Sequence, residues 1–208
     1  MTKTRIENLS DAVFAIVFTL LIIEIHVPEF HHEHVTNWEL WQGLYSITSL
    51  FISYYVSFIV LVMFWIAHHA LFGFIERNIN RHLILLNFFF LCMIAFVPFS
   101  SNLIGTYSET ELAYVIYGLN ILAIGMTNLA MLKYAVYSKD IDTTEVSPSL
   151  FRPAKSRFVI TPLFALIGII IVFINLPLAL IFFAFPILFN IIPGGVNYLE
   201  RKFRLNFG

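Results

Sequence analysis

Polar side chains that could do chemistry form two groups beside or within apolar runs of this chain. The first group comes just before an apolar run and the second lies inside a later one: Arg5, Ser10, Asp11, Trp65, His68 and His69. Ionised groups near hydrocarbon are costly unless they are used. A carboxylate beside imidazoles can relay protons, or it can accept hydrogen bonds that hold helices together. A charged collar that leads into an aliphatic helix can also form the mouth of a gated cation pathway.

Other kinds of chemistry are not supported by the residue patterns. Adjacent histidines point about 100° apart on a helix, and the spacing His-x-x-x-His is absent, so we expect no metal site at His68 and His69. The run from His26 to His34 can bind zinc or sense pH, but such a run is more often a solvated loop. No phosphate loop, dinucleotide turn or nucleophile elbow is present, so we expect neither an enzyme nor a cofactor. A net charge of −1 implies no nucleic-acid partner.

The elements that must position these residues are membrane helices. Apolar residues make up 59% of the 208 residues, charged residues make up 12%, and the mean hydropathy is +0.84. A spanning helix needs roughly 20 apolar residues. We therefore predict an all-α membrane protein in a lipid bilayer, one domain over residues 1–208, with six spans at about 12–27, 42–75, 82–105, 112–134, 158–175 and 177–195. The second span is over-long, so it must tilt, project, or begin as an interfacial segment around Trp38–Gln42.

The positive charges predict how the chain crosses the membrane. All twelve Lys and Arg residues fall before the first span, after the last, or in or beside the loops after the second and fourth. The positive-inside rule then places both termini in the cytoplasm. His68 and His69 consequently lie at the same membrane depth as Ser10 and Asp11.

The first helix carries one aliphatic stripe. At about 100° per residue, an arc of about 100° holds four residues: Ile16, Thr19, Leu20 and Ile23. Asp11 falls on the opposite face, Glu24 flanks the outer end of the stripe, and Arg5 returns to the stripe side if the helix reaches back that far. One interpretation is that the stripe is ordinary packed core. The other is that it lines a symmetry axis, where aliphatic rings gate by dewetting and a threonine oxygen meets a dehydrating ion.

Several of these residues together resemble a known family. Arg5, Leu9, Ser10 and Asp11 fit the Arg-x-x-x-Phe-Ser-Asp signature of the transmembrane protein 175 family, the endosomal and lysosomal potassium channels with their prokaryotic relatives; Leu9 replaces the usual phenylalanine. The run from Trp65 to His69, Asn87 and the pair Pro98-Phe99 are also similar. The resemblance covers the whole chain as one six-helix unit.

The resemblance implies a potassium-permeable, potassium-preferring channel without a Thr-Val-Gly-Tyr-Gly filter. Helix 1 of each unit would line the central pore, with the constriction at Ile16, Leu20 and Ile23 and with Thr19 beside it. Animal members hold two units per chain, whereas this chain holds one, so the expected assembly is a homotetramer in the cell membrane of a prokaryote. Potassium and other monovalent cations are the expected permeant partners.

The remaining site residues receive supporting roles. We expect a structural network of Arg5, Ser10, Asp11, Trp65, His68 and His69, in which Asp11 braces helix 1 against the tryptophan and the histidines. Glu24 is expected in the outer vestibule, where its carboxylate raises the local cation concentration. The alternative is a proton-coupled secondary transporter that uses Asp11, His68 and His69 as a relay, although no inverted repeat or paired broken helix is evident.

Overall fold

The computed structural model describes residues 2–32, 34–73, 75, 79–138, 141 and 148–186, with only the backbone described for 148–157. Within this part the chain is all-helical. Its eight helices are α1 (Lys3–Ile23), α2 (Asn37–Ser46), α3 (Thr48–Gly73), α4 (Arg81–Ala95), α5 (Val97–Thr106), α6 (Glu111–Tyr137), α7 (Pro148–Val172) and α8 (Leu176–Ala184).

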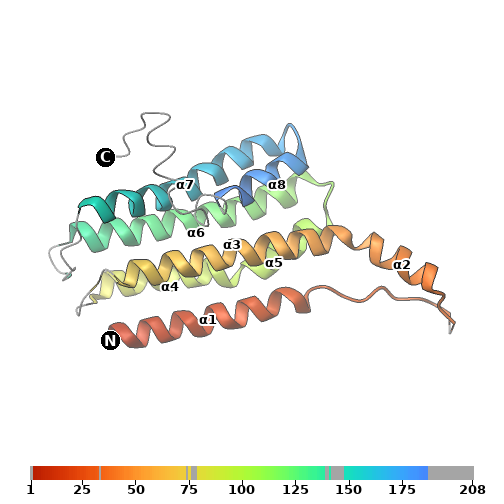
Figure 1. Ribbon diagram of the computed structural model, residues 1–208, viewed down its shortest axis with the longest axis horizontal. Coiled ribbons are helices and arrows are strands. Elements are labelled where there is room, and N and C mark those ends of the chain that lie inside the picture. Colours follow the sequence, from red (N-terminus) through yellow and green to blue (C-terminus); the bar gives the residue numbers. More distant parts are fainter. Residues whose placement is uncertain are drawn as a thin grey trace.

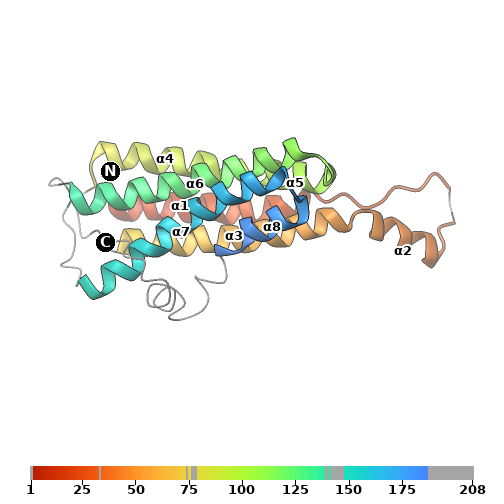
Figure 2. The same cartoon turned by 90° about the horizontal axis from the view of Figure 1, so that it is seen from above.

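The long helices lie side by side along one axis (Figures 1 and 2). Figure 1 shows α1 at one edge, α3 with α4 and α5 in the middle, and α6 with α7 and α8 at the other edge. The core between them is mostly aliphatic and includes several aromatic side chains, of which Phe14, Phe72, Phe90 and Tyr117 are almost completely buried. α1 packs against α3, α4 and α5, so its position depends on the middle layer.

The first helix differs from the predicted span 12–27 at both ends. α1 begins at Lys3 and ends at Ile23, where Glu24 is its C-cap. Two of the polar side chains before position 12 have backbone acceptors: the Lys3 ammonium donates to the carbonyl of Ile75 at 2.7 Å, and Ser10 donates to the carbonyl of Ile6 at 2.9 Å. Since the helix includes Arg5, that side chain lies about 20° from Ile16 around the helix axis, on the stripe side.

The predicted span 42–75 consists of two helices. α2 and α3 are separated at Ile47, and α2 starts with a capping box in which the side chains of Thr36 and Glu39 each accept the other's backbone N–H. α2 projects beyond the end of the bundle (Figure 1). The segment around Trp38–Gln42 is therefore a separate helix, and α3 alone is long enough to cross a membrane.

The third predicted span, 82–105, corresponds to α4 and α5, which are interrupted at Phe96. Pro98 explains the interruption, because it has no N–H to donate to the carbonyl of Ile94 four residues earlier. The two helices continue in one direction, and Arg81–Thr106 is long and apolar enough for a single crossing.

The last three predicted spans match the helices less closely. α6 extends beyond the predicted span 112–134 at both ends. α7 begins at Pro148 rather than at 158, so the backbone helix includes the charged residues that precede the predicted span. α8 covers the first part of the span 177–195, and residues 187–195 of that span lie outside the described residues. Four helices of the described part are long and apolar enough to cross a membrane, and Phe158–Val172 is a shorter apolar helix. The count of six spans stays a prediction.

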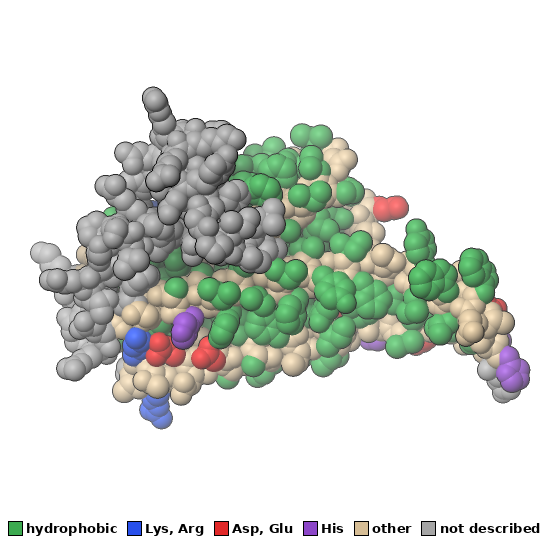
Figure 3. All heavy atoms as spheres, in the orientation of Figure 1, with side chains coloured by type: hydrophobic (Ala, Val, Ile, Leu, Met, Phe, Trp, Pro, Cys, Tyr) green, Lys and Arg blue, Asp and Glu red, His purple; other side chains and the backbone are tan. Residues whose placement is uncertain are grey.

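The two ends of the bundle differ in charge. The N-terminus lies at the same end as the α3–α4 and α6–α7 connections, and the α1–α2, α5–α6 and α7–α8 connections lie at the other (Figure 1). On the face shown in Figure 3, the Lys and Arg side chains gather at the N-terminal end, and hydrophobic side chains cover much of the length between the ends. The assignment of the N-terminal end to the cytoplasm stays a prediction.

Candidate ion pathway and the side chains that hold it

The aliphatic stripe of α1 faces away from the rest of the chain. Ile16 is 58% exposed, Leu20 is 39% exposed and Ile23 is 65% exposed. On the other side of the same helix, Phe14 and Leu21 are almost fully buried against the middle layer. The interpretation of the stripe as packed core is therefore wrong within a single chain, and the stripe is free to meet lipid or another subunit.

Thr19 lies exposed within this stripe. Its hydroxyl group donates to the carbonyl of Ile16 at 2.7 Å and lies 3.4 Å from that of Ala15. The proton of the hydroxyl is thus directed back into the helix. Because a hydroxyl oxygen also has two acceptor lone pairs, the exposed side of Thr19 offers an acceptor, which is the group that a partly dehydrated cation needs.

Ser10 fixes α1 to the middle layer through a buried chain of hydrogen bonds. The amide of Asn87 on α4 donates to Ser10 Oγ at 3.2 Å, and Ser10 donates to the carbonyl of Ile6 at 2.9 Å. His68 Nε2 lies 2.8 Å from Asn87 Oδ1. Since Asn87 Oδ1 can only accept, Nε2 of His68 must carry the proton. The bonds therefore run in one direction from α3 through α4 to α1.

Asp11 is held by a second, separate contact. The indole Nε1 of Trp65 on α3 donates to Asp11 Oδ1 at 2.9 Å. The ring of His69 stacks on Trp65, with centroids 6.1 Å apart and planes at 26°. Asp11, Trp65 and His69 are all exposed, whereas His68 is buried. The expectation that both histidines would hold Asp11 is therefore corrected: His68 bonds to Asn87, and His69 contacts the tryptophan.

The six predicted network residues thus divide into three groups. Ser10 and His68 share the buried chain, and Asp11, Trp65 and His69 share the exposed contact. Arg5 is exposed on the stripe side, and its side chain forms no hydrogen bond or ion pair with another described residue. It does not join the network in this chain.

Asn87 is the residue that the sequence analysis left out of the network. It is completely buried and bonds to both His68 and Ser10. The signal was its amide inside an apolar span, because such amides usually join membrane helices. Which helices this amide joins depends on packing and has no signal in the sequence.

Glu24 is tied to α5 at the outer end of the stripe. Asn102 donates to Glu24 Oε2 at 2.7 Å, and the hydroxyl of Thr106 donates to Asn102 Oδ1 at 2.8 Å. The predicted vestibule carboxylate is therefore half-buried and engaged. It anchors the last turn of α1 immediately after Ile23.

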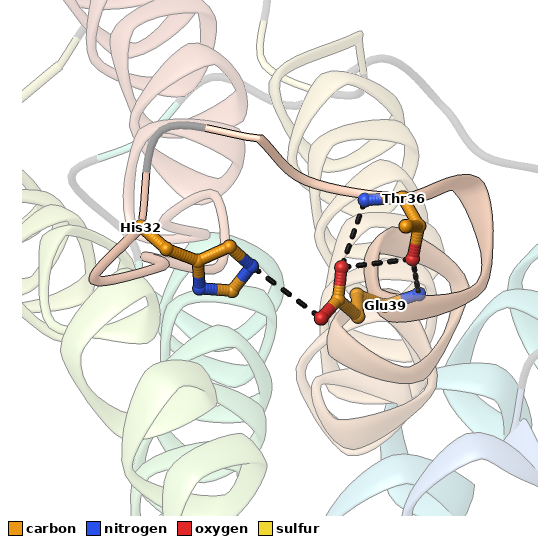
Figure 4. Close-up of polar contacts among 3 residues, drawn as sticks. All are labelled: His32, Thr36 and Glu39. Carbon is orange, nitrogen blue, oxygen red and sulfur yellow. Dashed lines mark hydrogen bonds and ion pairs between the residues drawn. The ribbon is translucent and has the colours of Figure 1, made fainter.

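A further carboxylate, Glu39, lies in the first turn of α2. Glu39 Oε2 accepts from the backbone N–H and the hydroxyl of Thr36, both at 2.8 Å, and Oε1 lies 3.4 Å from His32 Nε2 (Figure 4). The backbone hydrogen bond from Thr36, followed by that of its hydroxyl, lowers the pKa of Glu39 below its ordinary value of 4.5. Among the described residues no group of three or more His, Cys, Asp or Glu side chains could hold a metal ion; Glu33 lies outside them.

Fold and site together define a class of protein: an all-helical, multi-pass membrane protein whose first helix is anchored by polar side chains and turns an apolar stripe outward. The model of the family described as endosomal/lysosomal potassium channel TMEM175 matches residues 5–98, which include the whole polar network.

Individual relatives agree with this match. The chain is 28% identical to a potassium channel of Streptomyces collinus over 85% of each chain. It is 27% identical to a potassium channel of a Chryseobacterium species over 99% of this chain and 100% of that one. Its structure resembles the crystal structure of a lysosomal potassium-selective channel TMEM175 homolog from Chamaesiphon minutus, with a TM-score of 0.78 and 25% identity over 90% of this chain and 95% of that one.

The chain is therefore similar to the TMEM175 family over residues 5–98 and to bacterial potassium channels over most of its length. It is a multi-pass integral membrane protein of a prokaryote, and the bacterial relatives that it matches are named as potassium channels.

Proposed function

We propose that this chain is one subunit of a homotetrameric, potassium-preferring cation channel, with six transmembrane helices and both termini in the cytoplasm. The stripe of Ile16, Thr19, Leu20 and Ile23 on α1 lines the central pore. The observation that carries the proposal is the outward exposure of this stripe on a helix whose opposite face is anchored by hydrogen bonds. The names of the bacterial relatives support potassium as the permeant ion.

The physical basis of the gate is the reluctance of water to fill a narrow apolar pore. Rings of Ile16, Leu20 and Ile23 around a four-fold axis form constrictions that gate by dewetting. A cation that passes them must shed part of its hydration shell, and the outward oxygen of Thr19 replaces some of that shell. Small differences in dehydration cost between potassium and sodium then give a preference without a filter of backbone carbonyls.

The polar contacts orient the pore helix. Ser10 and Asp11 attach α1 to α4 and α3, and Glu24 attaches its outer end to α5. Ser10 and Asp11 lie away from the stripe and Glu24 lies beside its end, so the three bonds together oppose rotation of the helix about its axis. A rotation of about 100°, the angle of a single residue, would exchange the stripe for another face.

A proton-coupled transporter would need a connected relay. The hydrogen bonds of the described residues do not link Asp11, His68 and His69, since His68 bonds to Asn87 while Asp11 bonds to Trp65. This arrangement favours a bracing role for these side chains over proton transfer between them.

The test is recording from purified protein in planar bilayers with asymmetric potassium and sodium. We expect unitary current steps and a reversal potential displaced toward that of potassium. Leu20→Ala widens a constriction and should change the conductance or the selectivity. The matched control is Ile22→Ala, which shortens an exposed side chain about 120° away from Ile16 around the helix. Absence of cation current, or saturable proton-coupled flux without unitary steps, would contradict the proposal.

A further inference from the structure

A small cavity lies where α3, α6, α7 and α8 meet, and none of its lining residues belongs to α1. All but two of the lining residues are apolar, and the two polar ones are Asn128 on α6 and Thr161 on α7. The cavity is therefore separate from the proposed pore. The polar groups on its wall indicate what kind of molecule can bind in it.

Asn128 is buried without complete hydrogen bonding. Its side chain is 3% exposed, and Oδ1 has no hydrogen-bond partner among the residues that the structure describes. Buried polar atoms in proteins almost always have a partner. This applies with more force inside a bilayer, where no bulk water is available. An unpaired acceptor on a cavity wall points to a donor that occupies the cavity.

The crossing of α6 and α7 supplies a second acceptor. A Cβ atom on Gly125 would lie 3.1 Å from Pro162 Cδ and 3.2 Å from its nitrogen, so the two backbones are close here. Pro162 has no N–H and cannot donate to the carbonyl of Phe158, four residues earlier in α7. Phe158 lines the same cavity. Asn128 Oδ1 has no partner among the described residues, and the carbonyl of Phe158 lacks the helical donor that a non-proline residue at position 162 would supply. The two acceptors thus belong to facing helices that line one cavity.

The size and chemistry of the cavity restrict what can bind. The free space is about 20 Å³; a buried water needs roughly 10–15 Å³, whereas the engineered cavity that binds benzene measures about 150 Å³. A charged donor is disfavoured, because nothing of opposite charge lines the wall. The occupant must be small, neutral and able to donate twice.

We propose that a single water molecule occupies this cavity and joins α6 to α7. It donates one hydrogen bond to Asn128 Oδ1 and one to the carbonyl of Phe158, and it pairs with the hydroxyl of Thr161. The water replaces the N–H that Pro162 lacks, which allows a proline in the middle of a membrane helix. This site depends neither on the tetramer nor on the identity of the permeant ion.

The experiment is solid-state NMR of the full chain in lipid bilayers, with magnetisation transferred from water to the side-chain amides. The Asn128 signal is identified by its absence from the spectrum of Asn128→Leu. We expect rapid transfer to Asn128. The control is Asn120, whose Oδ1 is also buried and unpaired but which does not line the cavity, so transfer to it should be slow.

A structure of the protein at a resolution that shows ordered water gives an independent answer. Density for one water within hydrogen-bond distance of Asn128 Oδ1 is expected in the wild type, and it should be absent in Asn128→Leu, whose side chain fills the space. An empty cavity, slow transfer to Asn128, or density for a lipid or detergent chain would overturn the proposal. If the leucine variant fails to fold, the density in the wild type alone decides.

Discussion

The buried chain from His68 through Asn87 to Ser10 gives the sharpest prediction for stability. We consider Asn87→Leu, which keeps the approximate volume of the side chain and removes both hydrogen bonds. The Nε2 proton of His68 then has no acceptor in a buried site. Ser10 loses its donor but still donates to the carbonyl of Ile6.

The magnitude follows from these two losses. An unpaired buried donor costs about 1–3 kcal/mol, and a hydrogen bond between membrane helices contributes about 0.6 kcal/mol on average. Asn87→Leu should therefore lower the free energy of unfolding by about 2–4 kcal/mol. When both partners become apolar the cost largely disappears, so adding His68→Phe to Asn87→Leu should recover part of the lost stability.

The assay is reversible unfolding in mixed micelles, with both single variants and the double variant in one cycle. Asn120→Leu is the control: it also replaces a buried amide, but it removes one bond, to Ser100, and an acceptor that had no partner. We expect a smaller effect from the control than from Asn87→Leu. The proposed hydrogen-bond chain would be refuted by equal losses of stability in Asn87→Leu and Asn120→Leu. It would also be refuted if the double variant lost as much stability as the two single variants added together.

Three further predictions concern the contacts at the ends of the site. Trp65→Phe removes the donor to Asp11. Because that contact is exposed, we expect the free energy of unfolding to fall by less than about 1 kcal/mol. A fall of several kcal/mol would contradict the assignment of a minor, exposed contact. Asn102→Leu releases Glu24 from α5. We expect broader cation selectivity in bilayer recordings and little change in the free energy of unfolding. Unchanged selectivity would contradict a role of Asn102 in positioning Glu24. The pKa of Glu39 is lowered in the folded chain, so its stabilisation of the start of α2 is complete at neutral pH and is lost as the pH falls below about 4.5. The hydrogen-exchange protection of α2 amides, relative to the intrinsic exchange rate at each pH, should fall over this range in the wild type and stay constant in Glu39→Gln.

The sequence predicted the features that depend on one helix alone. The stripe of α1 followed from helical periodicity, and the structure keeps Ile16, Leu20 and Ile23 on one exposed face. The break near Pro98 and the separate helix α2 also had local signals, a proline without an N–H and the pair Thr36 and Glu39 at capping-box spacing. Both signals are local in sequence and mark helix ends.

The features that depend on contacts between helices were not predictable in the same way. His68 and Asp11 lie at one membrane depth, but the rotation of α3 sends His68 to Asn87 and leaves Trp65 beside Asp11. The engagement of Glu24 likewise requires Asn102, which is distant in sequence. Periodicity gives the angle of a side chain on its own helix, and only packing decides which neighbour it meets.

The central claim is that the stripe of α1 faces an ion pathway, and adjacent residues test it most directly. Ile23 and Ile22 are both exposed, but about 100° apart on the helix. In a background with the exposed Cys92 replaced by serine, the variants Ile23→Cys and Ile22→Cys are treated with a small cationic thiol reagent during bilayer recording. The account predicts that the current through Ile23→Cys is blocked and that the current through Ile22→Cys is not. Block of neither variant, or of Ile22→Cys alone, would contradict it.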